Sequence, residues 1–143
     1  MGYEFLEDVA LADVACKVWG DTPEVLFKEA GVALVNVMIK NTDAIQGNES
    51  RSLHVCGDTM ELLLFNFLQE IIYYKDAEKL LLVYYHLDIE NTQKEWVLNC
   101  RAAGEVLDPL RHEQLVDVKA VTLHQLEVSR KDRGWSAFII LDI

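Results

Sequence analysis

The sequence predicts an α+β fold, a two-layer sandwich in which a mostly antiparallel sheet carries two helices packed on one face. Two segments have the apolar spacing of helices, and the segments with a strand pattern are distributed unevenly around them. The chain of 143 residues is long enough for one compact domain, and no repeat, low-complexity tract or long linker divides it. We therefore expect residues 1–143 to form a single domain.

The predicted strands are segments in which apolar residues alternate with polar ones or run continuously between turn residues. They are Tyr3–Leu6, Asp13–Trp19, Arg51–Cys56, Leu80–Ile89, Trp96–Ala103, Val118–Val128 and Trp135–Leu141. Residues 130–134 form a short polar stretch before the last of them. The last two strands are therefore expected to pair as a hairpin.

Two helices are predicted from apolar residues that recur on one side. The first begins at Thr22-Pro23, because proline suits the first helical position, and extends for about 17 residues. The second begins at Asp58, where residues 58–61 have the form of a capping box. It is apolar around most of its surface, so we expect it to be the more buried helix.

The charge balance restricts the partners. Thirteen Lys and Arg residues against 24 Asp and Glu residues give a net charge of −11 and a pI near 4.7. Such a charge repels a phosphate backbone, because nucleic-acid affinity comes largely from clustered Lys and Arg. We expect no direct tight nucleic-acid binding, although the acidity can equally serve solubility alone.

The chain has the composition expected of a soluble cytoplasmic protein. No apolar run approaches the roughly 20 residues that a membrane span needs, and the first residues lack the pattern of a signal peptide. Cys16, Cys56 and Cys100 are too widely spaced for a disulfide framework or a metal knuckle. We expect them to be buried free thiols in a reducing compartment.

Motifs for catalysis are missing from the sequence. It contains no phosphate-binding loop, no dinucleotide-binding glycine pattern and no nucleophile elbow. The four histidines form no closely spaced pair of zinc ligands, and the cysteines lie in apolar strand patterns. We therefore expect no catalytic residue and no organic cofactor, and predict that the protein is not an enzyme.

Carboxylates in three places are the residues with the clearest chemical meaning. These places are Glu7, Asp8 and Asp13 between the first two strands, the polar turn 108–112, and Asp142 with Ile143 after a continuous apolar run. Crowded anions beside a buried strand are costly unless a cation compensates them, and oxygen ligands suit calcium or magnesium. Alternatively, Asp13 caps a turn and Asp142 is simply solvated.

An ordered series of short motifs extends over almost the whole chain. The N-terminal pieces are Tyr3-Glu4-Phe5-Leu6-Glu7, Ala12-Asp13-Val14, Trp19-Gly20 and Thr22-Pro23-Glu24. The central piece is Leu62–Glu70, followed by Asp76. The C-terminal pieces are Gly104-Glu105, Asp108-Pro109, Arg111-His112-Glu113, Val118–Thr122, His124 and Leu141-Asp142-Ile143. This ordered series resembles the archease family, and its order is more specific than any single piece.

The resemblance implies an accessory protein rather than an enzyme. Archeases are small α+β proteins that stimulate the GTP-dependent RtcB-type RNA ligase of tRNA splicing and RNA repair, promoting its guanylylation and turnover. They bind a divalent metal ion, expected to be calcium, through the aspartate of the Ala-Asp-Val motif and the Asp-Ile end. Carried over to this sequence, the metal ligands are Asp13, Asp142 and Ile143, the last through main-chain oxygen. The implied protein partner is an RNA ligase.

The chain departs from the family just before Asp13. The family commonly has an acidic residue and then His-Thr before Ala-Asp, whereas residues 7–13 read Glu-Asp-Val-Ala-Leu-Ala-Asp. The effect of this change is open, as are the roles of Lys119, Thr122 and His124. Two other functions stay open: a metal-dependent hydrolase, for which no base is evident, and a general chaperone-like protein-binding module.

Overall fold

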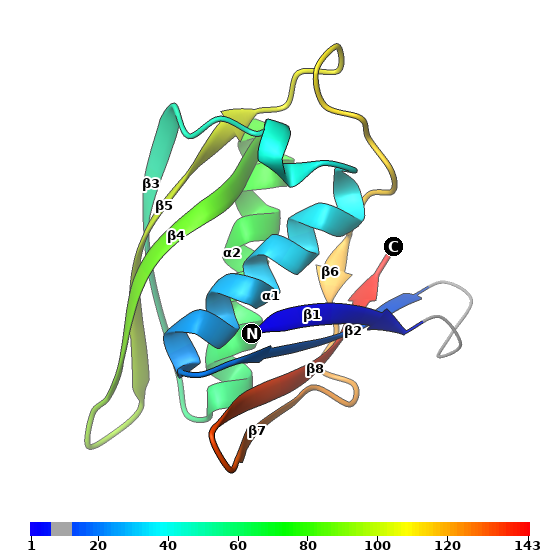
Figure 1. Cartoon of the computed structure of the whole chain (residues 1–143). Coiled ribbons are helices and arrows are strands. Elements are labelled where there is room, and N and C mark those ends of the chain that lie inside the picture. Colours follow the sequence, from blue (N-terminus) through cyan, green and yellow to red (C-terminus); the bar gives the residue numbers. More distant parts are fainter. Residues whose placement is uncertain (7–12) are drawn as a thin grey trace.

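A computed structural model describes residues 1–6 and 13–143, and within them the strands form two antiparallel sheets (Figure 1). A five-stranded sheet contains β1 (Gly2–Leu6), β2 (Asp13–Gly20), β6 (Ala120–Val121), β7 (Glu127–Lys131) and β8 (Gly134–Asp142). A three-stranded sheet contains β3 (Glu49–Gly57), β5 (Trp96–Val106) and β4 (Leu80–Asn91). The helices are α1 (Pro23–Met38) and α2 (Met60–Glu78), with a short 3₁₀ turn at Thr42–Ala44.

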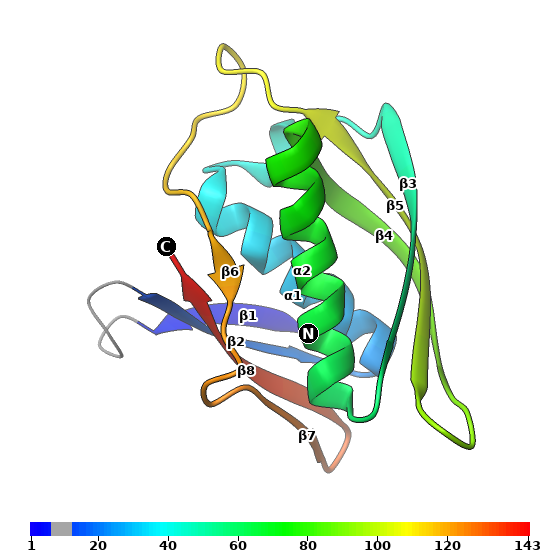
Figure 2. The same ribbon diagram turned by 180° about the vertical axis from the view of Figure 1, so that it is seen from behind.

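The two helices lie between the two sheets (Figures 1 and 2). Helix α1 contacts β1, β2 and β8 on one side and β4 on the other, and α2 contacts β6 and β7 as well as the three strands of the smaller sheet. The α+β class is thus confirmed, while the strands that we expected in one sheet are divided between two. The composition of α2 explains the division, since a helix that is apolar around most of its surface needs cover on two sides.

The core fills the space between the helices and the sheets. Phe27 of α1 and Phe67 of α2 are fully buried, with ring centroids 5.8 Å apart, and Tyr85 of β4 meets Phe67 edge-on at 5.5 Å. The Tyr85 hydroxyl donates a hydrogen bond to the carbonyl of Leu82. Aromatic rings packed in this way stabilise a core beyond the area that they bury. The core therefore joins both helices to the smaller sheet.

The helix starts agree with the sequence in one case and differ by one residue in the other. Thr22 caps α1, its hydroxyl accepting a hydrogen bond from the Val25 N–H at 3.2 Å, and Pro23 follows as predicted. Helix α2 is capped by Thr59 rather than Asp58, with its hydroxyl accepting from the Leu62 N–H at 3.1 Å. The prediction of Asp58 as the start was wrong. Thr59 is the N-cap, because it has the extended backbone and its side chain accepts the hydrogen bond from the first turn of the helix.

The predicted strand Val118–Val128 was wrong as a single element. It is two short strands, β6 and β7, separated by a turn in which Gln125 has a left-handed backbone with φ 57°. Both strands pair antiparallel with β8 and run in the same direction along it, so the apolar alternation across residues 118–128 is interrupted by the turn between them and by a shift of register. The hairpin predicted at the C-terminal end is confirmed as β7 and β8.

In the part of the chain that the structure describes, no helix is both long and apolar enough to cross a membrane.

Candidate metal centre

The site begins with two aspartates on neighbouring strands. In the antiparallel pair of β2 and β8, Asp13 lies directly opposite Asp142, and both are partly exposed. Residues in such a pair place their Cβ atoms about 4.5–5.5 Å apart on the same sheet face. The structure therefore brings together two carboxylates that lie near opposite ends of the sequence, and like charges directly opposite each other repel.

A third strand holds the main chain of this site. Ala120 of β6 lies opposite Asp142 on its other side, and the Lys119 N–H donates a hydrogen bond of 2.8 Å to the Asp142 carbonyl. Ile143 follows, half-buried and packed against the core. The positions of Asp142 and Ile143 are thus fixed by strands on both sides and by the core.

Compensating charge is lacking near the two aspartates. Among residues 1–6 and 13–143, no Lys, Arg or His forms an ion pair with Asp13 or Asp142. Lys119, whose role the sequence left open, has an exposed side chain and contributes its main-chain N–H. A bound cation would supply the missing compensation.

An orphaned hydroxyl lies on the same sheet. The side-chain oxygen of Thr122 is buried and has no hydrogen-bond partner among the described residues, while the Thr122 N–H donates to the Ile140 carbonyl at 3.0 Å. Because strand residues alternate, Thr122 shares a face with Ala120 and is a diagonal neighbour of Asp142. A buried unpaired hydroxyl is costly, and it adds one more oxygen to the donors gathered at this sheet edge.

The donor set fits a hard cation. Carboxylate, main-chain carbonyl and hydroxyl oxygens suit calcium or magnesium, and they do not suit soft metals. Within the described residues, no group of three His, Cys, Asp or Glu side chains is placed to hold an ion. Side chains of those residues alone therefore do not complete a coordination sphere, and main-chain oxygens or water would be required.

Some of the residues that the sequence singled out are not part of this site. Glu7 and Asp8, with the departure from the family pattern, lie outside the described residues. His124 is exposed in the turn between β6 and β7. The polar turn 108–112 directly follows β5, at the end of the long β5–β6 connection that is distant from the aspartate pair (Figure 1). The structure thus gathers Asp13, Asp142 and Ile143 and separates them from the 108–112 turn.

A second polar cluster joins Glu105 to the turn 108–112 that the sequence singled out, and this pairing was not predicted. Glu105 of β5 is 9% exposed and His112 is 2% exposed, and the His112 Nε2 lies 3.0 Å from a Glu105 carboxylate oxygen. Arg111 forms an ion pair with the same carboxylate, which also accepts a hydrogen bond from the Gln46 N–H at 3.0 Å. The signal was a glutamate inside an apolar strand pattern. These contacts hold the turn 108–112 against β5, so we assign the cluster a structural role.

The protonation state of His112 follows from its contacts. The Asp108 N–H donates to Nδ1 at 2.8 Å, so Nδ1 is an acceptor and the proton lies on Nε2, toward Glu105. Burial lowers the pKa of His112, and the charge of Arg111 lowers it further, while Asp108 acts in the opposite direction. His112 is therefore neutral at pH 7 in the folded chain.

Acid should destabilise the protein through His112. As pH falls below about 6.5, the unfolded state binds a proton that the folded state takes up only at lower pH, so the free energy of unfolding decreases. The slope reaches at most about 1.4 kcal/mol per pH unit. Urea unfolding of His112→Asn between pH 5 and 7 should lack this slope, whereas the exposed control His86→Asn should retain it. An unchanged slope in His112→Asn would contradict the assignment.

The cysteines do not provide a nucleophile. Cys16 and Cys100 are buried free thiols as predicted, and burial raises the pKa of Cys16 to about 12 and that of Cys100 to about 11. Cys56 is only half-buried, and its sulfur lies 3.7 Å from His54 Nε2. Desolvation and the nearby carboxylate of Glu95 raise the pKa of Cys56, so the thiol is protonated at neutral pH. A Cys–His nucleophile is therefore not activated here.

The fold and the site define a class: small α+β proteins with two helices between two antiparallel sheets and, here, two aspartates that face each other on neighbouring strands. The family model described as the Archease protein family matches residues 3–143. Similar curated proteins include the protein archease of Pyrococcus abyssi, 35% identical over 92% of this chain and 93% of its own length. The protein archease of Methanopyrus kandleri is 34% identical over 100% of both chains. This chain belongs to the archease family.

Solved structures share the fold. The solution structure of Methanobacterium thermoautotrophicum protein 1598 superposes with a TM-score of 0.85 at 28% identity, covering 99% of each chain. The crystal structure of a Thermotoga maritima archease, titled as a possible chaperone, has a TM-score of 0.61 at 18% identity and covers 94% of this chain and 93% of its own. The latter resemblance concerns the fold alone.

Proposed function

We propose that this chain is a metal-binding accessory protein that activates an RNA ligase by promoting its guanylylation and turnover, in tRNA splicing and RNA repair. The observation that carries the proposal is the opposition of Asp13 and Asp142 across β2 and β8, at the positions that match the family's metal ligands. Family membership over residues 3–143 supports the accessory role.

The ion is a divalent cation, and the all-oxygen donor set favours calcium. Asp13 and Asp142 would hold it through their carboxylates and Ile143 through main-chain oxygen. Bound there, the ion neutralises the repulsion between the two aspartates. The chain's own residues then determine the shape of the edge: the Lys119 N–H holds the Asp142 carbonyl, and the core holds the Ile143 side chain.

The hydrolase alternative has less support. A metal-dependent hydrolase needs an open metal position with a general base beside it. Such a base would be a third titratable side chain beside Asp13 and Asp142. In the described part of the chain, no further His, Cys, Asp or Glu is grouped with these two aspartates. His124 is exposed in the turn that follows β6, and the buried His112 is committed to Glu105.

Surface charge favours a protein partner over RNA itself. A chain with a net charge of −11 has an unfavourable interaction with a polyphosphate, whereas a protein partner can present a complementary surface. A general chaperone-like role differs from ligase activation in one measurable way. A chaperone acts on many unfolded clients, but an activator stimulates one enzyme.

Ligation assays test the proposal directly. The protein alone should show no ligase or nuclease activity, and substoichiometric amounts should increase the number of turnovers of the RNA ligase from the same organism. The formation of the ligase–guanylate intermediate should accelerate in parallel. RNA ligation by this protein unaided, or tight RNA binding at physiological salt, would show that the accessory-factor assignment is wrong. Suppression of the aggregation of unrelated proteins would favour the chaperone alternative.

A further inference from the structure

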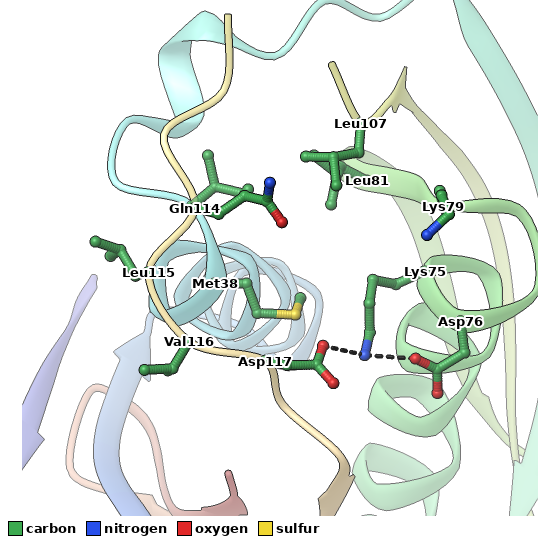
Figure 3. A pocket seen from close by; sticks show the side chains of 11 residues that line it. Met38, Lys75, Asp76, Lys79, Leu81, Leu107, Gln114, Leu115, Val116 and Asp117 are labelled. Carbon is green, nitrogen blue, oxygen red and sulfur yellow. Dashed lines mark hydrogen bonds and ion pairs between the residues drawn. The ribbon is translucent and has the colours of Figure 1, made fainter. Parts of the chain in front are cut away.

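A cleft away from the aspartate pair separates the C-terminal ends of the two helices. It has a volume of about 340 Å³ and lies between α1, α2 and the segment 114–117 (Figure 3). We call it the helix-end cleft. Its apolar wall comes from Met38, Leu81 and Leu107, and its charged lining consists of two lysines and two aspartates, Lys75, Lys79, Asp76 and Asp117. The side chains of Met38 and Gln114 point into the hollow from one side, and the two lysines approach it from the other (Figure 3).

Lys75 is already fully used inside the protein. Its ammonium group contacts Asp76 at 2.5 Å and Asp117 at 2.6 Å, and it donates to the Val118 carbonyl at 2.9 Å. Desolvation alone would lower the pKa of Lys75, but the hydrogen bonds and charges of Asp117 and Asp76 together raise it. An ammonium has three donors, and here each has a partner. Lys75 therefore closes the base of the cleft and leaves no donor for a ligand.

Lys79 is in a different position. Its side chain is exposed and, among the described residues, forms no ion pair. It caps α2 with a left-handed backbone, φ 52° and ψ 31°, and its N–H bonds to the Tyr74 carbonyl. Glycine is the residue that this cap position favours, and a lysine there is strained by comparison. The left-handed backbone therefore does not explain why residue 79 is a lysine. What a lysine adds at this position is an exposed ammonium group beside the cleft.

The outside of the cleft is also unusual. Leu115 and Val116 point away from the hollow on the outer side of the segment 114–117 and are 50% and 44% exposed (Figure 3). The backbone of this segment is held in place, because the Leu115 N–H donates to the Met38 carbonyl at 2.8 Å. Adjacent exposed apolar side chains on a fixed segment mark a surface for a macromolecule rather than a small solute.

We propose that the helix-end cleft docks a peptide segment of the activated ligase in which a large apolar side chain lies next to a carboxylate. The apolar side chain enters between Met38 and Leu107, and the carboxylate pairs with Lys79. The partner surface around this segment covers Leu115 and Val116. The inference rests on the proposed function for the identity of the partner. Because the rest of the chain is acidic, Lys79 orients the peptide locally and gives little long-range attraction.

The chain offers a matched pair of variants. Lys79→Gly removes the ammonium and at the same time relieves the left-handed backbone, so the folded protein should be as stable as wild type or more stable. Asp132→Gly relieves a left-handed residue with φ 40° in the turn between β7 and β8, remote from the cleft. A loss of binding in the first variant only cannot then be attributed to the backbone change or to unfolding.

Calorimetric titration with the purified ligase decides the matter, with thermal melts run in parallel. Lys79→Gly should weaken ligase binding by about two- to fivefold with no fall in melting temperature, and Leu115→Ser should weaken it by a similar factor. Asp132→Gly should bind like wild type. If wild type binds and stimulates the ligase and both cleft variants do the same, the cleft proposal is wrong and the proposed function stands.

Three further outcomes would also overturn the proposal. If wild type neither binds nor stimulates the ligase, the proposed function fails, and the assigned partner fails with it. If the cleft variants change the association state of this protein in light scattering and leave ligase binding untouched, the cleft contacts a second copy of the chain. If inorganic phosphate or acetate at millimolar concentration competes fully with the ligase, the cleft is a small-anion site.

Discussion

Replacing Asp13 by Asn should make the protein more stable without calcium and less stable than wild type with it. In the absence of the ion, Asp13 and Asp142 face each other as like charges, and the substitution removes a repulsion of about 0.2–1 kcal/mol. With calcium at 100 times its Kd, wild type gains about 2.7 kcal/mol, because only the folded chain has the site. The variant, with a neutral amide in place of one ligand, gains much less. The order of the two melting temperatures therefore inverts when calcium is added.

Two controls separate a ligand from a general acidic effect. Asp142→Asn should behave like Asp13→Asn, since either substitution removes both the repulsion and a ligand. Asp88→Asn, an exposed aspartate of β4 that lies opposite Asn99, should respond to calcium as wild type does. Equal calcium stabilisation of Asp13→Asn and wild type would remove Asp13 from the ligand set. If calcium stabilised neither wild type nor any of the variants, the proposed metal site would be wrong. Ligase stimulation should fall together with calcium affinity in both aspartate variants.

The second large effect is expected from a single methyl group at Gly104. This residue lies in β5, the central strand of the smaller sheet, opposite Leu82, where the register of β4 is interrupted before Tyr84. A Cβ at this position would lie 1.7 Å from the Leu81 carbonyl oxygen, and main chain that is paired in a sheet cannot easily move away. Gly104→Ala should therefore destabilise the fold by about 3 kcal/mol or more, at the upper end of overpacking effects.

Urea unfolding gives the measurement, and Gly47→Ala gives the control. A Cβ at residue 47 would meet the edge of the Tyr84 ring at 3.3 Å, a contact with a side chain that is 46% exposed and can shift by a few tenths of an ångström. Its destabilisation should be below about 1 kcal/mol, in the range of an ordinary surface substitution. If Gly104→Ala unfolded at the same urea concentration as Gly47→Ala, the close approach of β4 to β5 would not exist in solution.

The sequence predicted local structure better than long-range pairing. The cap at Thr22-Pro23 and the hairpin at the C-terminal end depend on neighbouring residues, and both are confirmed. The division into two sheets depends on which distant strands share a ladder, and alternation within a strand carries no information about its partner. The apolar surface around most of α2 indicates burial on two sides, but the prediction drawn from it was only that α2 is the more buried helix.

The candidate site shows the same limit. Asp13 and Asp142 could be singled out as charges beside apolar runs, and the family resemblance joined them, but their direct opposition depends on the register of β2 with β8. The Glu105–His112 pair was missed because it forms only when the turn at residues 108–112 folds back onto β5. The orphaned Thr122 hydroxyl is a property of burial, which no spacing in the sequence reveals.

The pairing of β2 with β8 has a consequence for how the protein comes into being. The strand that carries Asp13 is synthesised before both helices and the smaller sheet, and the strand that carries Asp142 is synthesised after them. Closing so long a loop is slow, and the contact cannot form on a nascent chain that still lacks β8. Ion binding at this pair of strands would then depend on the pairing itself. Molecules in which β8 has not yet joined β2 would not bind calcium at this site, and molecules in which the two strands are paired would bind it.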